Sequence, residues 1–283
     1  MKNVLTMLLT CAILCGCDKL TPIEGVPVNT PADGKPLASD KATWWQPKAG
    51  VTFDWYLDDL NDGDVFSAQV VDVDAFSTTA EQIAKFHAQG KRVIAYLSVG
   101  TFEDGRPDLN LLPKEVIGKV YPEWPDEKWL DIRQLEKLKP WLNSRFRMII
   151  SKGFDGIEPD NIDGFTTTTG FPLTAADTKK YCDLLISMAH SNGLGIGQKN
   201  VPEFVDSYYK KFDWMITEDA FDQGWENQLT PYISANKPVF AVEYTDQTAQ
   251  SKFSGTVCPK AKKLGFYALL KKRSLDKWNL VCQ

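Results

Sequence analysis

The sequence predicts an α/β fold, a single-domain (β/α)8 (TIM) barrel, and three observations lead to this prediction. Short apolar runs alternate with helical runs from Thr52 onward, and such alternation favours a parallel sheet. The apolar runs number eight, and 283 residues suffice for one barrel of eight units. Polar residues follow most of these runs, at the end where such barrels hold their active sites. An open doubly wound sheet is the alternative, but no G-x-G-x-x-G motif follows the first run.

The individual elements follow from local patterns. Strands, as short runs rich in β-branched and aromatic residues, are expected at 53–56, 65–71, 92–99, 154–157, 194–198, 214–217, 238–242 and 266–270. Helices are expected at 78–89, 135–152 and from 174 to about 193. Thr78 with Glu81 would form a capping box for the first helix, and Thr174 with Asp177 would cap the third. The segment 101–129 contains four prolines, and a loop of this length is usually functional or carries small helices.

Residues 1–16 predict a signal peptide. Lys2 supplies a positive charge, and the apolar stretch 4–14 is too short to span a bilayer. The following Leu14-Cys15-Gly16-Cys17 resembles a bacterial lipoprotein signal, in which the last Cys is lipidated and becomes the new N-terminus. We therefore expect Cys17 to carry acyl chains, and this anchor to be the protein's contact with a membrane. A plain secretory signal peptide is the alternative.

The residues after the lipidated Cys predict a location and a tether. Asp18 resembles the signal that retains enteric-type lipoproteins at the inner membrane, so we expect the periplasmic side of the cell envelope. Residues 17–45 contain several prolines and glycines among polar residues, which is typical of an extended tether. The folded domain is therefore expected at 46–283.

Three cysteines remain after the predicted cleavage and lipidation. Because an exported domain permits a disulfide, we expect Cys258 to pair with Cys282 and to tie the last residues to the body. Cys182 lies in a helical run and is predicted to be a buried free thiol. The two histidines, His87 and His190, also lie in helical runs, which argues against a zinc site or a Ser-His-Asp triad. No metal or other cofactor is predicted.

The overall charge limits the class of partner. The formal net charge is −5, which argues against a nucleic acid and against binding to an anionic membrane surface. It favours a cationic substrate, and the protein is expected to be a monomer. Hydrophobic residues make up 43% of the chain and charged residues 24%, as in a globular protein with a packed core.

The stretch from Gly153 to Phe165 concentrates acidic residues at the end of a predicted strand. Glu158, Asp160 and Asp163 lie there with Asn161 among them. Because side chains alternate along a strand, Glu158 and Asp160 should face the same way. An acidic surface turn is the alternative interpretation, since Asp and Asn favour turns.

Other predicted strands also end in polar residues, which are Asp72 and Asp74, Ser98, Lys199, Glu218 and Glu243. Carboxylates packed together without a purpose would repel one another. No phosphate-binding loop, metal-ligand spacing or nucleophile elbow accompanies them. Six aromatic residues are expected near the rim, namely Trp44, Trp45, Trp55, Tyr56, Trp124 and Trp129. Carboxylates in a barrel mouth, with aromatic rings to stack on sugars, indicate glycoside hydrolysis, which needs two carboxyl groups from different strands.

Several ordered motifs occur along the chain, and they are Val71 to Phe76, Val93 to Gly100 with Glu103 and Arg106, Trp129 to Ile132, Gly153 to Gly164, Gln198 to Asn200, Glu218, and Val239 to Tyr244. Together they resemble glycoside hydrolase family 114, whose type activity is endo-α-1,4-polygalactosaminidase. The resemblance spans about residues 44–272. It implies a (β/α)8 barrel that acts with retention, with Asp160 as the nucleophile and Glu218 as the acid/base. Where family members commonly have cysteines after this Glu, the chain has Ala220.

The strand-end pattern and the resemblance together predict the residues that bind substrate. They are Asp72, Asp74, Tyr96, Glu103, Arg106, Glu158, Asn161, Asp163, Lys199, Asn200, Asp219, Glu243 and Tyr244. Lys199 is expected to keep Asp160 ionised, and the remaining acids are expected to pair with amino groups of a cationic galactosamine polymer. A non-catalytic barrel that binds an envelope polysaccharide is the alternative, because fold does not fix function.

Overall fold

The computed structural model describes residues 43–61 and 63–282. The predicted signal peptide at 1–16, the lipidation site Cys17 and most of the predicted tether at 17–45 lie outside the described residues. Within the part of the chain that is described, no helix is both long enough and apolar enough to cross a membrane.

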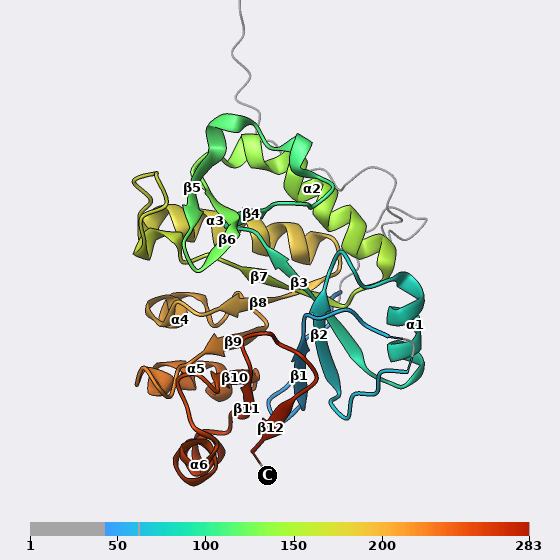
Figure 1. The fold of residues 1–283 in the computed structure, drawn as a ribbon, viewed down its shortest axis with the longest axis vertical. Coiled ribbons are helices and arrows are strands. Elements are labelled where there is room, and N and C mark those ends of the chain that lie inside the picture. The colour runs from blue at the N-terminus through green and yellow to red at the C-terminus, as the bar shows by residue number, and fades with distance from the viewer. Residues whose placement is uncertain (1–42, 62, 283) are drawn as a thin grey trace, which may run out of the picture.

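Eight parallel strands form a curled sheet, and each pairs with the next in chain order (Figure 1). They are β1 (Phe53–Tyr56), β2 (Val70–Asp74), β3 (Arg92–Ser98), β7 (Gly156–Asp160), β8 (Gly195–Lys199), β9 (Trp214–Glu218), β10 (Val239–Tyr244) and β11 (Tyr267–Lys271). A ninth strand, β12 (Asn279–Val281), pairs antiparallel with β11. Side chains join the two edges, because Asp54 accepts from Asn279 Nδ2 at 2.9 Å and Lys271 Nζ at 3.1 Å. The predicted (β/α)8 barrel is confirmed.

Helices cover the outside of the strands. They are α1 (Ala80–Ala88), α2 (Leu135–Lys152), α3 (Ala175–Ser191), α4 (Val205–Tyr208), α5 (Thr230–Ser234), α6 (Gln250–Lys252) and α7 (Cys258–Leu264). In Figure 1, α2 and α3 lie above the sheet, α1 lies to its right, and α4, α5 and α6 lie to its left and below. A wide helical turn, Phe253–Val257, joins α6 to α7. The shell leaves the carboxyl ends of the strands available for a site.

The ends of the long helices follow from capping chemistry. Helix α2 has the predicted bounds and ends at Gly153, whose φ of 92° is the left-handed conformation that glycine adopts without strain. The predicted cap of α3 is confirmed, since Thr174 Oγ1 accepts from the backbone of Asp177. The capping box predicted for α1 from Thr78 and Glu81 was wrong by one residue.

At the start of α1, Thr79 is the residue in extended conformation, and its side chain accepts from the Gln82 backbone N–H. The Gln82 side chain in turn accepts from the Thr79 N–H. Thr78 is buried, and its N–H bonds back to Asp74 O at 3.2 Å, so it belongs to the turn that leaves β2. Two adjacent threonines made the one-residue shift invisible in the sequence.

The bounds of two strands differ from the prediction at both ends. The strand expected at 65–71 is β2, Val70–Asp74, and the strand expected at 154–157 is β7, Gly156–Asp160. Both real strands extend through acidic residues, because those side chains point into the barrel rather than into a solvated turn. The alternative of an acidic surface turn at Glu158 and Asp160 is therefore wrong.

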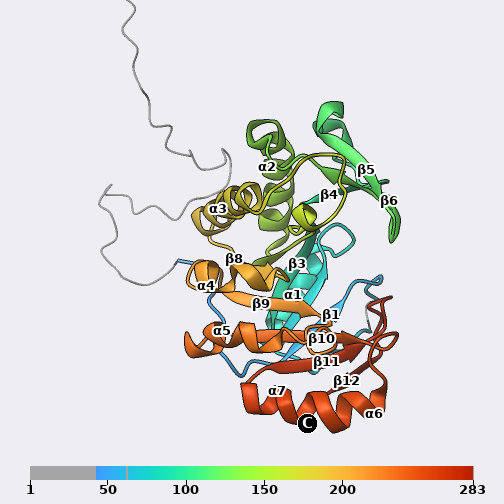
Figure 2. The same ribbon diagram turned by 90° about the vertical axis from the view of Figure 1, so that its left-hand side faces the viewer.

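The segment 101–129 contains an antiparallel sheet as well as small helices. Strands β4 (Thr101–Glu103), β6 (Trp124–Leu130) and β5 (Ile117–Tyr121) pair in that order, and two 3₁₀ turns, Leu109–Leu111 and Lys114–Val116, connect them. The small helices are confirmed, whereas the sheet was not predicted. Figure 2 shows the β5–β6 hairpin projecting on the side to which the carboxyl ends of β10 and β11 point.

Trp214 fills the amino-terminal end of the barrel interior. A Cβ added to Gly156, Gly195 or Gly197 would lie within 2.8 Å of its ring, so the glycines make room for it. Trp45 packs against the same ring, with centroids 5.4 Å apart. The predicted rim position of Trp45 is therefore wrong.

Trp44 lies at the same amino-terminal end, which corrects its predicted rim position too. Its ring stacks on His190 at 3.8 Å, and its indole N–H donates to Asp213 Oδ1 at 3.1 Å. Both tryptophans precede β1 in the sequence and lie at the amino-terminal end of the barrel, away from the carboxyl ends of the strands.

The cysteine predictions are confirmed. Cys258 and Cys282 form a disulfide that ties the segment after β12 to the start of α7. Cys182 is a free, buried thiol in α3, and burial raises its pKa to about 12. It is therefore inert as a nucleophile at neutral pH.

Candidate active site

A cleft of about 1430 Å³ opens at the carboxyl ends of the parallel strands. The strand ends, the loops that follow them and the β5–β6 hairpin line it. Twelve of the predicted site residues lie on its wall, which are Asp74, Tyr96, Glu103, Arg106, Asp160, Asn161, Asp163, Lys199, Asn200, Glu218, Asp219 and Tyr244. These twelve predicted residues therefore come together in one cleft.

Lys199 lies at the centre of the carboxylates. Its ammonium Nζ is 2.8 Å from Asp160 Oδ1, 2.8 Å from Glu158 Oε1 and 3.3 Å from Glu218 Oε2. The ammonium also lies 4.5 Å from the centre of the Trp55 ring, and the Lys199 side chain is 2% exposed. Burial alone would lower the pKa of Lys199, but the three carboxylates raise it well above its usual value. Lys199 therefore stays protonated, and its ammonium contacts all three acids.

Asp160, at the end of β7, is held in its ionised form. Burial would raise the pKa of Asp160, but the Lys199 ammonium and a hydrogen bond from Tyr96 hold it below its usual value. The Tyr96 hydroxyl donates to Asp160 Oδ2 at 2.9 Å. The two carboxylate oxygens therefore have different partners, and the expectation that Lys199 keeps Asp160 ionised agrees with this geometry.

Glu218, at the end of β9, is oriented by two neighbouring strands. The Tyr244 hydroxyl donates to Glu218 Oε1 at 2.7 Å, and Asn200 Nδ2 donates to Oε2 at 3.0 Å. Asn200 Oδ1 also accepts from the Glu218 backbone N–H at 2.9 Å, which fixes the strand end itself. The Glu218 side chain is 27% exposed, so it can reach a molecule in the cleft.

Two further acids on the cleft wall have raised pKa values. Burial, together with the charge of Asp160, raises the pKa of Asp163 to about 6. Burial raises the pKa of Glu127 to about 7, although a hydrogen bond from Thr101 opposes the shift. Glu127 lies on β6 and was not predicted, because the prolines of the hairpin hide its strand pattern. The unusual length of the segment 101–129 was the sequence feature that could have pointed to Glu127.

Arg106 neutralises part of the acidic wall. It lies 2.6 Å from Asp74 Oδ2 and 2.5 Å from Glu103 Oε1. Burial would raise the pKa of Asp74, but Arg106 holds it below its usual value. These three predicted site residues form one ion-paired group.

Arg273, in the loop after β11, is a cleft residue that the sequence did not single out. Its guanidinium lies 2.6 Å from Asp219 Oδ2 and 3.9 Å from the centre of the Tyr244 ring. Asp219 Oδ1 accepts from the Tyr244 backbone N–H at 3.0 Å. Arg273 and Asp219 thereby support the tyrosine that contacts Glu218.

Three predicted substrate-binding residues do not line the cleft. Asp72 and Glu158 are 0% exposed and lie inside the barrel below the cleft floor. Glu243 points to the other face of β10 from Tyr244, because neighbouring side chains alternate, and accepts from the backbone N–H groups of the loop after β9. Burial raises the pKa of Glu243 to about 7. These placements fit support of the site rather than contact with substrate.

Besides Tyr96 and Tyr244, four aromatic side chains line the cleft, and these are Trp55, Tyr121, Trp124 and Trp225. Trp124, on the hairpin, is 50% exposed and offers a ring face to a ligand. Of the other residues expected at the rim, Tyr56 and Trp129 are buried in the core. The β5–β6 hairpin thus adds an exposed aromatic side chain, Trp124, to a cleft whose other walls are largely acidic.

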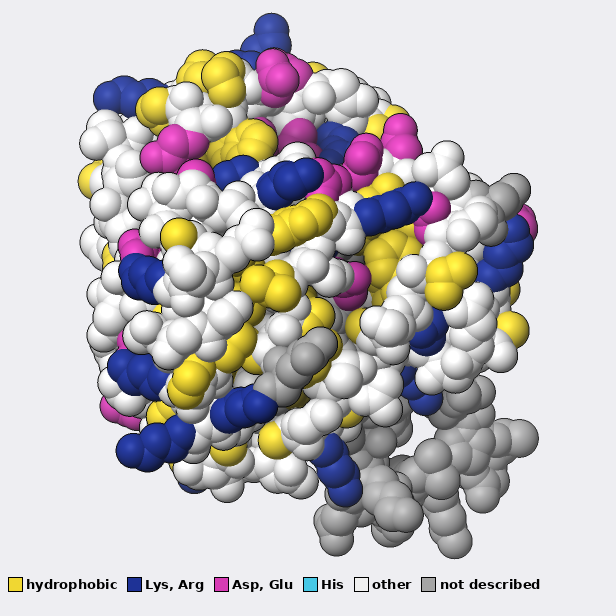
Figure 3. Space-filling view, turned by 60° about the horizontal axis from the view of Figure 1, so that its bottom comes forward, with side chains coloured by type: hydrophobic (Ala, Val, Ile, Leu, Met, Phe, Trp, Pro, Cys, Tyr) yellow, Lys and Arg dark blue, Asp and Glu magenta, His cyan; other side chains and the backbone are white. Residues whose placement is uncertain are grey.

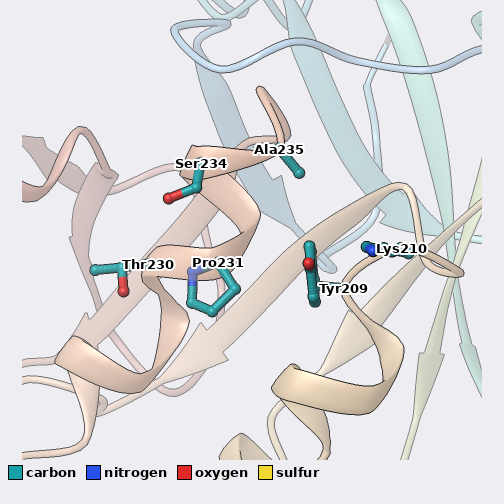
Figure 4. Close-up of a pocket in the computed structure, with 6 residues that line it drawn as sticks. All are labelled: Tyr209, Lys210, Thr230, Pro231, Ser234 and Ala235. Carbon is teal, nitrogen blue, oxygen red and sulfur yellow. The ribbon is translucent and has the colours of Figure 1, made fainter.

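A smaller cavity of about 500 Å³ lies in the helical shell between α4 and α5 (Figure 4). Its lining residues are Tyr209, Lys210, Thr230, Pro231, Ser234 and Ala235. None of these is an acid, so the cavity offers no pair of carboxyl groups for glycoside chemistry.

On the face shown in Figure 3, acidic side chains lie mostly in the upper half of the view, with basic and apolar side chains among them. Among the described residues, no three His, Cys, Asp or Glu side chains are arranged to hold a metal ion.

Comparison with known proteins adds a family and a fold. Residues 34–283 match the model of glycoside-hydrolase family GH114. The crystal structure of Aspergillus fumigatus Ega3 in complex with galactosamine is 31% identical, covers 84% of this chain and 97% of that chain, and has a TM-score of 0.78. The glycoside hydrolase domain of PelA from Pseudomonas aeruginosa shares the fold, with 14% identity, coverage of 81% and 97%, and a TM-score of 0.62. Among proteins with curated descriptions, none matches this chain.

Proposed function

The chain belongs to glycoside-hydrolase family GH114 and is a glycosidase; from this premise we propose that it cleaves α-1,4-linked galactosamine-containing polysaccharide with retention of configuration. The single observation that carries the proposal is the pair Asp160 and Glu218, which approach one buried ammonium from neighbouring parts of the cleft. The similarity to Ega3, which was solved with galactosamine, supports the amino sugar.

The separation of the two acids supports retention. Asp160 Oδ1 and Glu218 Oε2 both contact Lys199 Nζ, at 2.8 and 3.3 Å. The distance between these two oxygens therefore cannot exceed the sum of the two contact distances. That sum is less than roughly 6.5 Å, the smallest separation typical of the carboxyl groups of inverting enzymes. An inverting reaction requires a water molecule between one carboxylate and the sugar, and this separation leaves little room for it.

In the first step, an Asp160 oxygen attacks the anomeric carbon while the bond to the leaving oxygen breaks. Glu218 gives its proton to that oxygen, so the leaving sugar departs with a hydroxyl group. In the second step, Glu218 takes a proton from water as the water oxygen attacks the same carbon and releases Asp160. Two inversions leave the product in its starting α configuration.

The acidic wall supports a cationic substrate. Asp163, Glu127 and Asp219 lie along the cleft, and their carboxylates can pair with sugar ammonium groups when ionised. The exposed ring of Trp124 can stack on a sugar farther along the polymer.

Partially deacetylated polygalactosamine, incubated with the protein, tests this function. The expected result is a release of shorter oligomers that is absent in Asp160→Asn, which preserves size while removing the nucleophile. A melting temperature close to that of the wild type would show that this variant is folded. Binding of the polymer without shortening would favour the non-catalytic barrel instead.

We also propose that the chain is a monomer anchored to the periplasmic side of the envelope through lipid on Cys17. The Leu14-Cys15-Gly16-Cys17 pattern and the Pro-rich stretch before the domain support this proposal. The first described residues join the barrel at its amino-terminal end, where Trp45 packs on Trp214. A tether at that end leaves the cleft free to face away from the membrane.

A further inference from the structure

Two buried carboxyl groups lie directly behind the proposed catalytic pair. Asp72 on β2 and Glu158 on β7 are each 0% exposed. Glu158 Oε1 accepts from Lys199 Nζ at 2.8 Å, but Glu158 Oε2 and both oxygens of Asp72 have no nitrogen or hydroxyl donor among the described residues. Leaving a buried polar group without a hydrogen-bond partner is unfavourable, and more so if the group is charged. Three orphaned oxygens in one place therefore require a common explanation.

A proton shared between Asp72 and Glu158 explains all three oxygens without a donor. A protonated carboxyl group donates to the other carboxylate, so one proton satisfies an oxygen of each. Burial and the adjacent Glu158 raise the pKa of Asp72 well above its usual value. Burial raises the pKa of Glu158 to about 7, although Lys199 opposes the shift. Two carboxylates that share a site cannot both ionise readily, and the proton belongs to the pair.

The charges that face this pair come from three strands. Lys199 on β8 is the cation, while Asp160 on β7 and Glu218 on β9 are the further carboxylates. With Glu218 protonated, as the first step requires, one ammonium still cannot balance Asp72, Glu158 and Asp160 if all three are ionised in this buried space. With one proton shared, the Asp72–Glu158 pair carries a single negative charge toward Lys199.

We propose that Asp72 and Glu158 share one proton and act as positioning residues, holding the Lys199 ammonium midway between Asp160 and Glu218. The inference rests on the proposed function. During the first step, Asp160 loses its charge by bonding to the sugar and Glu218 gains one by giving up its proton. The negative charge thus moves from one partner of Lys199 to the other. A fixed third partner behind the ammonium keeps Lys199 in reach of both, so that it stabilises each charged state in turn.

The shared proton is tested without substrate, by infrared spectroscopy of the carbonyl stretch of protonated carboxylic acids. The measurement is made at about pH 9, where Glu127 and Glu243, whose pKa values are about 7, are ionised. We expect an acid band in the wild type that disappears in both Asp72→Asn and Glu158→Gln. A band that persists in either variant, or no band in the wild type, overturns the shared proton.

The positioning role is tested by kinetics on the same variants and on Asp72→Leu. In Asp72→Leu, Glu158 keeps its ion pair with Lys199, so no buried charge is left without a partner and the variant should fold, which its melting temperature checks. We expect kcat to fall by up to about 100-fold in Glu158→Gln and Asp72→Leu with KM little changed, because a misplaced catalytic group acts on turnover. Asp72→Asn can donate its amide hydrogen to Glu158 and should recover most of the loss seen in Asp72→Leu.

Glu226→Gln is the matched control, since Glu226 is a buried carboxylate outside the barrel and pairs with Lys260. It should change neither the infrared band nor kcat. Equal kcat in Asp72→Leu and wild type, or no recovery in Asp72→Asn, contradicts the positioning role. If the wild type cleaves no polymer, the proposed function fails while the infrared result still decides the shared proton.

Discussion

The ammonium of Lys199 lies 2.8 Å from Oδ1 of Asp160, at the ends of the adjacent strands β8 and β7. This contact holds the pKa of Asp160 low in a place where burial would raise it. The consequence is a carboxylate that stays ionised inside a barrel, as a nucleophile must. The rest of the cleft is arranged around that pair.

The role of Glu218 predicts a dependence on the leaving group. Glu218→Gln removes the proton donor but keeps the size and one hydrogen-bond acceptor for Tyr244. Polymer cleavage should fall by about 100-fold or more, while activated aryl glycosides, which need little protonation, should lose far less in the first step. The ratio of kcat/KM for the two substrates measures this. Equal losses for both would show that Glu218 does not protonate the leaving oxygen.

The acids on the wall predict how substrate affinity changes with pH. Asp163 and Glu127, with pKa values of about 6 and about 7, lose their protons as pH rises through these values. The cleft therefore becomes more negative, and KM for a cationic polymer should fall between about pH 5 and pH 7.5. At constant ionic strength, Asp163→Asn with Glu127→Gln should flatten this trend. A KM that rises over the same interval in the wild type would contradict this account.

The disulfide predicts the stability of the barrel's last segment. Cys258 and Cys282 are 24 residues apart, and opening such a loop should cost roughly 3 kcal/mol in the chain-entropy model. The double variant Cys258→Ser/Cys282→Ser should therefore unfold at lower denaturant concentration with a similar slope. Cys182→Ser, which removes a buried free thiol, is the comparison that separates loss of the cross-link from loss of a cysteine. An unchanged midpoint in the double variant would rule out a stabilising role.

The proposed lipid anchor predicts a modified N-terminus. Cys17→Ser should abolish lipidation and leave the precursor uncut by lipoprotein signal peptidase. Mass spectrometry of the mature N-terminus measures this directly. An unmodified N-terminus downstream of Cys17 in the wild type would favour the plain secretory signal.

The sequence predicted the barrel and most of the cleft because both depend on local patterns. Helix α2 was predicted to the residue, since Gly153 marks its end, and the strand-end acids Asp160 and Glu218 both line the cleft. Glu243 was expected beside them, but the alternation of side chains turns it to the opposite face of the strand from Tyr244.

Other features depend on contacts distant in sequence. Arg273 reaches Asp219 across 54 residues, and nothing in its neighbours marks it as part of a cleft. The hairpin that carries Glu127 and Trp124 has prolines and register shifts that conceal a strand pattern. Asp72 was taken for a cleft residue, because the depth of a side chain within a barrel cannot be read from one strand.

The central claim is that Asp160 forms a covalent bond to the sugar, and the anomeric configuration of the first product tests it most directly. Proton NMR during the first turnovers reads that configuration before mutarotation mixes the anomers. A retaining reaction through Asp160 predicts the α anomer as the initial product. The β anomer as the initial product would show that a single inversion occurs, and would contradict the assignment of Asp160 as nucleophile.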